Sequence, residues 1–165
     1  MTLQSGYVLL PGEGKAVWSM SGLTTIKAST ETTQGRFGLF EQLLPPGFEP
    51  PAHVHEKEDE AFYILEGELS FRCGNQSGRA TPGSFLFLPR GVVHSFRIES
   101  STPAKILIFC TPGGFEHFFE EMGEPAQQRE LPPREQHEQG QHEPEKITLL
   151  AAKYKLSLKE PQLQS

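Results

Sequence analysis

Residues 47–67, GFEPPAHVHEKEDEAFYILEG, and residues 83–94, GSFLFLPRGVVH, decide how this chain folds. The first stretch has the arrangement G-x5-H-x-H-x4-E-x6-G, whose specified residues are Gly47, His53, His55, Glu60 and Gly67. The second has the arrangement G-x5-P-x-G-x2-H, whose specified residues are Gly83, Pro89, Gly91 and His94. Short apolar runs bounded by glycine and proline are typical of strands joined by tight turns.

The histidines and the glutamate of these two stretches form a candidate metal site. Side chains alternate faces along a strand, so His53 and His55 project from the same face. Glu60 opens the next strand after an acidic turn, and a hairpin brings its carboxylate back beside the histidines. His94 joins them from a later strand. Three imidazoles and one carboxylate suit Fe, Mn, Co, Ni, Cu or Zn and leave positions for water or substrate.

The rest of the chain up to about residue 111 continues the same pattern of short apolar segments and turns. Sixteen glycines and 14 prolines in 165 residues favour turns over helices. The pattern predicts a mostly β sandwich or barrel. The expected strands are Lys15 to Met20, Thr24 to Ala28, Arg36 to Leu44, Glu49 to His55, Glu60 to Leu65, Glu68 to Cys73, Ser84 to Leu88, Val92 to Ile98 and Ala104 to Thr111.

The periodicity changes after Pro112-Gly113-Gly114. Phe115, Phe118, Phe119 and Met122 recur at helical spacing, which predicts an amphipathic helix packed on the barrel. Residues 123–144 are polar and proline-rich, and we expect an exposed linker that could be disordered. A final helix is expected from Pro144 to Tyr154. The predicted organisation is a barrel with its packing helix over residues 1–125, and a polar linker with a short C-terminal helical extension over residues 126–165.

Both motifs resemble those of the cupin superfamily. The resemblance extends to the quercetin-dioxygenase-like single-domain cupins through Gly35-Arg36-Phe37, residues 50–55, residues 59–63 and Phe115 to Met122, and it covers about residues 7 to 125. It implies an all-β, jelly-roll β-barrel, a divalent transition metal on the four residues of the candidate site, and a homodimer. One departure is Ile98, where the second motif commonly has Asn; this position is not normally a ligand, so only a turn contact is affected.

Composition and charge exclude several classes of partner. The formal net charge is −6 and the pI is about 5.5, so we expect neither nucleic acid nor a membrane surface as a partner. Apolar runs such as residues 106–110 have strand length, far short of a membrane span. Residues 1–10 lack the pattern of a signal peptide, which predicts a cytoplasmic protein. In that compartment Cys73 and Cys110 are expected to be free, partly buried thiols.

Strand alternation also predicts what lies around the site. Phe62 and Ile64 share a face with Glu60, and Phe96 shares a face with His94, which indicates an apolar pocket beside the metal or ordinary barrel filling. Glu56, Glu58 and Asp59 are expected to form a solvated turn. Asn75-Gln76-Ser77 is also interpreted as a turn.

Several functions are compatible with these motifs, because one fold hosts many reactions. The resemblance implies a metal-dependent dioxygenase that combines O2 with a small aromatic or enolic hydroxy-carbonyl compound. Glu60 would then be a fourth ligand or the catalytic general base. The alternatives are a non-catalytic cupin that binds a small molecule or metal, and a redox-neutral isomerase or lyase.

The two ends of the chain carry apolar residues that a single barrel does not obviously cover. They are Tyr7 to Leu10, Trp18 and Ile147 to Tyr154. The final helix could dock on its own barrel or on a second subunit. Together with the resemblance, these segments predict a twofold dimer in which N-terminal strands extend the neighbour's sheet.

Overall fold

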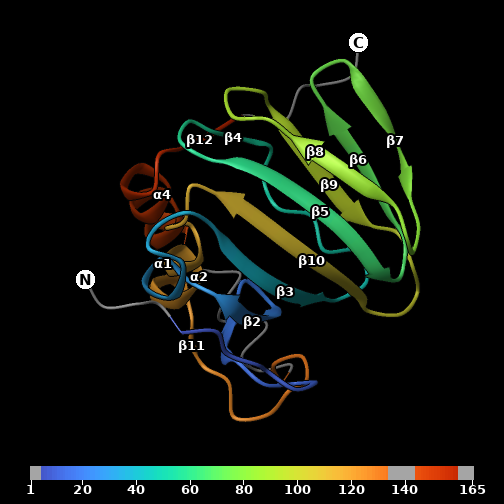
Figure 1. Ribbon diagram of the computed structural model, residues 1–165. Helices are drawn as coiled ribbons and strands as arrows, with labels where there is room; N and C mark the ends of the chain where they lie inside the picture. The colour runs from blue at the N-terminus through green and yellow to red at the C-terminus, as the bar shows by residue number, and fades with distance from the viewer. Residues whose placement is uncertain (1–4, 134–143, 160–165) are drawn as a thin grey trace.

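Two antiparallel β-sheets face each other in the computed structural model, which describes residues 5–133 and 144–159 (Figure 1). The strands are β1 Lys15–Ser19, β2 Gly22–Ala28, β3 Gly38–Leu44, β4 His53–His55, β5 Asp59–Glu66, β6 Leu69–Cys73, β7 Gln76–Ala80, β8 Phe85–Leu88, β9 His94–Ile98, β10 Ala104–Thr111, β11 Glu124–Pro125 and β12 Leu156–Leu158. The helices are α1 Thr30–Thr33, α2 Glu116–Met122 and α4 Pro144–Lys153.

The larger sheet has the strand order β11-β1-β2-β3-β10-β5-β8, and the smaller sheet has the order β12-β4-β9-β6-β7. The predicted all-β jelly-roll fold with a C-terminal helical extension is therefore confirmed.

The core lies between the inner faces of the two sheets. In β3, Phe40, Gln42 and Leu44 are buried while the residues that alternate with them are partly exposed, as the period of two requires. In β5 the buried positions are Glu60, Phe62 and Ile64, and in β9 they are His94, Phe96 and Ile98. The same alternation that predicts the strands therefore points the candidate ligands inward.

The predicted strands are all present, with ends shifted by a few residues, but β7 contradicts the expected turn at Asn75-Gln76-Ser77. The turn is Gly74 and Asn75, and Gln76 already pairs with Cys73 in a hairpin. Most side chains of β7 are exposed because it is the outermost strand of its sheet. A polar edge strand has no apolar alternation, which is why the pattern does not reveal it.

Both predicted helices form, and they pack at one end of the barrel. On α2, Phe119 contacts Phe40 of β3, with ring centroids 5.1 Å apart. Tyr154, just beyond α4, meets Phe118 edge to face at 6.0 Å. After α4 the chain continues into β12, which pairs with β4. The C-terminal helix thus docks on its own barrel in this structure (Figure 1).

Two turn positions explain the spacing of the motifs. Gly67 has φ 81°, and a Cβ there would lie 2.7 Å from that of Ala104, so the turn between β5 and β6 needs glycine. Ile98, the departure from the motif, is buried and holds its turn through the backbone. Its carbonyl accepts a 3.0 Å hydrogen bond from the Gly47 amide, and its amide donates to the Phe48 carbonyl at 2.9 Å.

The apolar residues at the two ends of the chain were expected to lie uncovered by a single barrel, and this holds for only some of them. Trp18 is buried, and its indole donates to the Glu130 carbonyl at 2.8 Å. Leu150 of α4 is also buried, whereas Tyr7 to Leu10 are exposed and are not in a strand. Within residues 5–133 and 144–159, no helix is both long and apolar enough to cross a membrane.

Candidate metal centre

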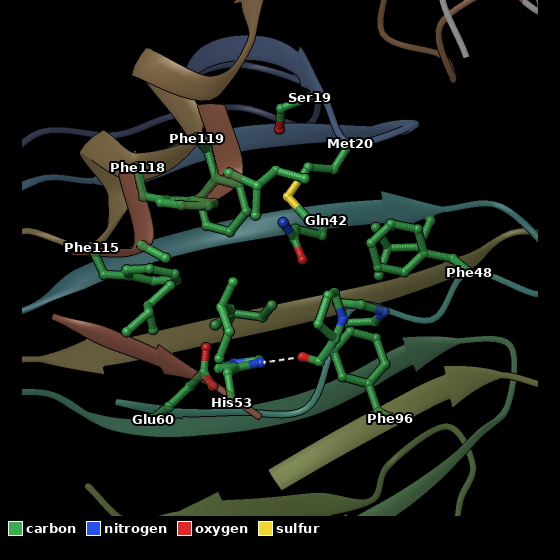
Figure 2. Close-up of a pocket in the computed structure, with 18 of the residues that line it drawn as sticks. Ser19, Met20, Gln42, Phe48, His53, Glu60, Phe96, Phe115, Phe118 and Phe119 are labelled. Atoms are coloured by element: carbon green, nitrogen blue, oxygen red, sulfur yellow. Dashed lines mark hydrogen bonds between the residues drawn. The ribbon is translucent and has the colours of Figure 1, made fainter. Parts of the chain in front are cut away.

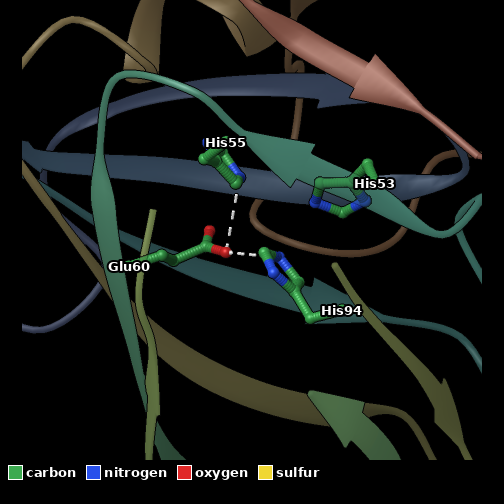
Figure 3. Close-up of side chains that lie close together, drawn as sticks. All are labelled: His53, His55, Glu60 and His94. Atoms are coloured by element: carbon green, nitrogen blue, oxygen red, sulfur yellow. Dashed lines mark ion pairs between the residues drawn. The ribbon is translucent and has the colours of Figure 1, made fainter. Parts of the chain in front are cut away.

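The four candidate ligands come from three strands that the fold brings together (Figure 3). His53 and His55 flank one residue of β4, and His53 lies opposite His94 in the pairing of β4 with β9. Glu60 projects from β5 in the facing sheet, so the hairpin predicted between the strands of His55 and Glu60 is wrong: the chain crosses from one sheet to the other between β4 and β5, and the packing of the sheets brings the carboxylate to the histidines. The turn before β9 is held against β4, because the Gly91 amide donates to the His55 carbonyl at 2.8 Å.

One atom from each of His53, His55, Glu60 and His94 lies within 4.8 Å of the corresponding atoms of the other three. Glu60 Oε2 is 3.4 Å from His55 Nε2 and 3.2 Å from His94 Nε2. Apart from these contacts with one another, the three buried atoms have no partner within the described part of the chain. Buried polar atoms that converge without partners fit a bound cation. The cluster could therefore bind a metal.

The outer nitrogen of each imidazole ring is held by a separate acceptor. His53 Nδ1 donates to the Pro51 carbonyl at 2.8 Å, and His94 Nδ1 donates to the Val92 carbonyl at 3.3 Å. His55 Nδ1 donates to a carboxylate oxygen of Glu58 at 3.4 Å. A proton on Nδ1 leaves Nε2 with its lone pair toward the centre, which is the tautomer that a metal needs.

Glu58 corrects one prediction from the sequence. It was expected in a solvated turn with Glu56 and Asp59, but its side chain is only 2% exposed. The acidic residues at 56, 58 and 59 look alike in the sequence, and only Glu58 turns inward toward His55. Asp59 instead pairs with Arg90 at 2.9 Å on the surface. Glu58 lies two residues before the inward-facing Glu60, so the alternation of β5 extended backwards would have been the signal for it, but turns break that period.

The charges of the cluster shift the pKa values of its members in opposite directions. Burial lowers the pKa of His55, but the carboxylates of Glu60 and Glu58 outweigh burial and raise it to about 9. Burial and the neighbouring His94 lower the pKa of His53 to about 4. Burial raises the pKa of Glu60, yet His55 and His94 hold it well below its usual range. At neutral pH and without metal, the cluster thus contains a carboxylate, a neutral His53 and a protonated His55, whose Nε2 must lose its proton before it can bind a metal.

Cys110 completes the surroundings of Glu60. Its thiol donates to Glu60 Oε1 over 3.8 Å, which leaves Oε2 for the histidines. Burial raises the pKa of this thiol well above its usual range, so it stays protonated and able to donate. Cys73 and Cys110 are both free, as expected from the sequence.

An apolar pocket opens on one side of the cluster (Figure 2). Its empty space, open mouth included, is about 700 Å3. His53 and Glu60 lie at one side of it, and Phe62 and Phe96 line it as the strand pattern predicts. Ile64, the third predicted residue, belongs to the core and does not line the pocket. The cluster therefore faces a space that a small apolar molecule could enter.

Sequence reasoning missed the part of this wall that comes from elements far away in the chain. The aromatic face of α2 and the C-terminal segment contribute Phe115, Phe118, Phe119, Ile147, Ala151, Leu156 and Leu158. The helical periodicity of α2 and α4 was visible in the sequence, but not the surface that each helix covers. The pairing of β12 with β4 places Leu156 and Leu158 opposite His55 and His53.

Fold and site together define a class: an antiparallel jelly-roll protein with a three-histidine, one-carboxylate cluster inside it. Comparison with known proteins agrees. The family model of the cupin domain matches residues 40–110. A quercetin 2,3-dioxygenase of Bacillus subtilis is 36% identical over 119 residues, which are 72% of this chain and 35% of that protein. An oxalate-binding protein of Thermotoga maritima is 32% identical over 80 residues, 48% of this chain and 66% of that protein.

Solved structures share the fold at lower sequence identity. A predicted oxalate decarboxylase from Thermotoga maritima superposes with a TM-score of 0.59 at 24% identity, covering 64% of this chain and 99% of that one. An RmlC-like cupin from Shewanella frigidimarina does so with a TM-score of 0.57 at 16% identity, covering 70% of this chain and 99% of that one. The chain belongs to the cupin superfamily. It spans little more than a third of the Bacillus dioxygenase.

Proposed function

We propose that this cupin is a metal-dependent dioxygenase that acts on a small aromatic or enolic hydroxy-carbonyl compound. The observation that carries the proposal is the position of the cluster: His53 and Glu60 line the same pocket as Phe62 and Phe96. A flat apolar molecule in this pocket would bring a polar edge to the cluster. The similarity to a quercetin 2,3-dioxygenase over 72% of the chain supports this class of substrate.

In this proposal His53, His55 and His94 hold a divalent transition metal, with Glu60 as the fourth ligand or as a base beside it. When bound, such a metal supplies Lewis acidity and coordination positions for an oxygen anion and for O2. The unpartnered Nε2 atoms of His55 and His94 fit this assignment. The carbonyls behind His53 and His94 keep those rings in place during turnover.

Glu60 is the residue proposed to move a proton. Its carboxylate lines the pocket and is ionised at neutral pH, which is the form that can accept the hydroxyl proton of an enolic substrate. Its lowered pKa makes it a weak base, so this transfer requires a substrate hydroxyl that the metal would acidify. The Cys110 thiol stays on Oε1, so Oε2, which faces His55 and His94 in this structure, is the oxygen that would take the proton. The surrounding phenylalanines make this side of the pocket apolar, which strengthens the electrostatic interactions of the carboxylate.

Metal analysis of the purified protein, followed by O2 uptake with a panel of flavonols and other enols, tests the proposal. Glu60→Gln should keep part of the metal and lose about 100-fold or more of the turnover, because the amide cannot accept a proton. Glu66→Gln, on the exposed end of the same strand, is the matched control and should keep parental turnover. Normal O2 uptake by Glu60→Gln would contradict the role of Glu60.

A binding function without turnover is the second candidate, favoured by the similarity to an oxalate-binding protein over 48% of the chain. The same cluster could hold a metal that captures a small anion in the pocket. Under this function the parent binds such a compound tightly and consumes no O2 with any enol. Calorimetric titration with oxalate and with the enol panel, alongside the O2 measurement, separates the two candidates.

We also propose that two copies of the chain form a dimer, and that the interface is the outer face of β8, β5 and β10. This outer-face patch is defined by Tyr63, Leu65, Phe85, Phe87 and Phe109. Phe85 and Phe87 are 67% and 58% exposed on β8, the edge strand of its sheet. With aromatic side chains of about 150–250 Å2 each, the patch exposes roughly 500 Å2 of apolar surface. Two such patches supply most of the roughly 1,200 Å2 that a stable interface buries.

The patch replaces the contact that the sequence predicts for the dimer. Trp18 is already buried inside its own chain, so removal of residues 1–20 would damage the barrel rather than test the interface. Phe87→Glu places a charge on the patch and should shift the mass in light scattering from a dimer to a monomer near 18.4 kDa. Val8→Glu, on the exposed N-terminal segment, should leave the dimer intact. A parent that is already monomeric would contradict the proposal.

A further inference from the structure

Across the pocket from the metal cluster, the wall carries polar side chains (Figure 2). They lie on the larger sheet: Ser19 ends β1, and Gln42 is on the inner face of β3 between Phe40 and Leu44. Both are buried, and both line the pocket. Burial of an amide or hydroxyl among phenylalanines costs about 1–3 kcal/mol unless the group is hydrogen-bonded. We therefore expect the polar atoms of Ser19 and Gln42 that face the pocket to form hydrogen bonds with a bound molecule.

Gln42 is held in one orientation by its neighbour. Thr24 of β2 lies directly opposite it, and Gln42 Nε2 lies 3.1 Å from Thr24 Oγ1. This hydrogen bond occupies the NH2 end of the amide. The carbonyl end points into the pocket, toward the side where His53 and Glu60 lie (Figure 2). Gln42 thus offers a fixed acceptor to a molecule in the pocket.

Ser19 adds a second polar atom on the same wall. Its side chain is 8% exposed, and its hydroxyl has no hydrogen-bond partner among residues 5–133 and 144–159. It precedes the two-residue turn of Met20 and Ser21, which have φ values of 49° and 69°. Left-handed conformations at two successive residues other than glycine are costly, and this turn brings Met20 onto the pocket wall beside Ser19.

We propose that Ser19 and Gln42 form a polar subsite for a hydroxyl group at the end of the substrate remote from the metal cluster. The preferred ligand then has three parts: an enolic hydroxy-carbonyl group at the cluster, a flat apolar body along the phenylalanines, and a hydroxyl group at the far end. That hydroxyl donates to the Gln42 carbonyl, and the Ser19 hydroxyl supplies a second polar group on the same wall. This inference rests on the proposed function, whose substrate class it makes more specific.

Paired ligands that differ by one hydroxyl group test the subsite. We suggest 3-hydroxyflavone and its 4′-hydroxy and 7-hydroxy derivatives, titrated by calorimetry into the full-length protein as purified, without O2 so that no turnover occurs. One derivative should bind about 5- to 10-fold more tightly than 3-hydroxyflavone, as expected for one or two net hydrogen bonds. Gln42→Leu should abolish this ratio and leave the affinity for 3-hydroxyflavone nearly unchanged.

Two further variants keep the test decisive if Gln42→Leu folds poorly. Ser19→Ala removes only a hydroxyl and should reduce the ratio about 2- to 3-fold. Glu41→Gln, on the opposite face of β3, is the control and should keep the parental ratio. A parental ratio of 1 for both derivatives, a ratio that survives both subsite substitutions, or failure of all three flavones to bind would overturn the subsite. O2 uptake is measured separately, so a protein with the expected ratio and no O2 consumption would overturn the dioxygenase function alone.

Discussion

Glu58→Gln is the substitution that best tests whether the hydrogen bond between Glu58 and His55 Nδ1 strengthens metal binding by the cluster. The Glu58 side chain is 2% exposed, and its carboxylate accepts the Nδ1 proton of His55 at 3.4 Å. The glutamine keeps the size of the side chain and an acceptor oxygen but removes the negative charge. Loss of a carboxylate behind a ligating histidine typically weakens metal binding by about 10- to 100-fold. Because 3.4 Å is long for this contact, we expect a loss near the lower limit, about 10-fold.

The loss should depend on pH, because protons compete with the metal for His55. With the pKa of His55 at about 9 and a pH of 7, this competition weakens apparent metal binding by about 100-fold in the parent. Glu58 helps to raise that pKa, so Glu58→Gln lowers it and relieves part of the competition. The measured loss should therefore be smaller at pH 7 than at pH 9.

Chelator competition at the two pH values measures these affinities, and circular dichroism checks that each variant is folded. Glu56→Gln is the matched control, since Glu56 lies in the same turn and is exposed. It should bind metal as the parent does. Parental affinity of Glu58→Gln at both pH values, or an equal loss in Glu56→Gln, would refute the supporting role of Glu58.

Two other predictions concern the cluster. His53→Ala and His94→Ala should each lose most of the bound metal in elemental analysis. Circular dichroism should still show the β signal, because the apolar core supplies most of the burial. Full metal occupancy in either variant would refute the assignment of the metal site. In the metal-free protein, the raised pKa of His55 contributes stability that is fully present below about pH 6.5 and is lost as the pH rises through about 9. Denaturant titrations of the metal-free protein from pH 6 to 9.5 should show this decline, and a His55→Gln variant should show a smaller one.

Much of the fold was predictable because local sequence patterns specify it. Alternation along β5 and β9 assigns the inward faces, and the glycine and proline turns separate the strands. The four candidate ligands follow from the same logic, since the spacing of His53 and His55 places both on one face of β4. The structure brings all four together. Strand β7 was missed because a polar edge strand lacks this alternation.

The sequence by itself determined most of the strands, their inward faces and the four residues of the cluster, because alternation within each strand and the spacing of the two motifs encode them. Tertiary structure decided most of what surrounds the cluster beyond Phe62 and Phe96. Glu58 is buried because its turn folds back on His55, and Leu158 meets His53 through a pairing across more than 100 residues of chain. Gln42 faces the pocket because β3 lies in the opposite sheet from β4. Such neighbours are set by how the sheets pack, and no local period encodes them.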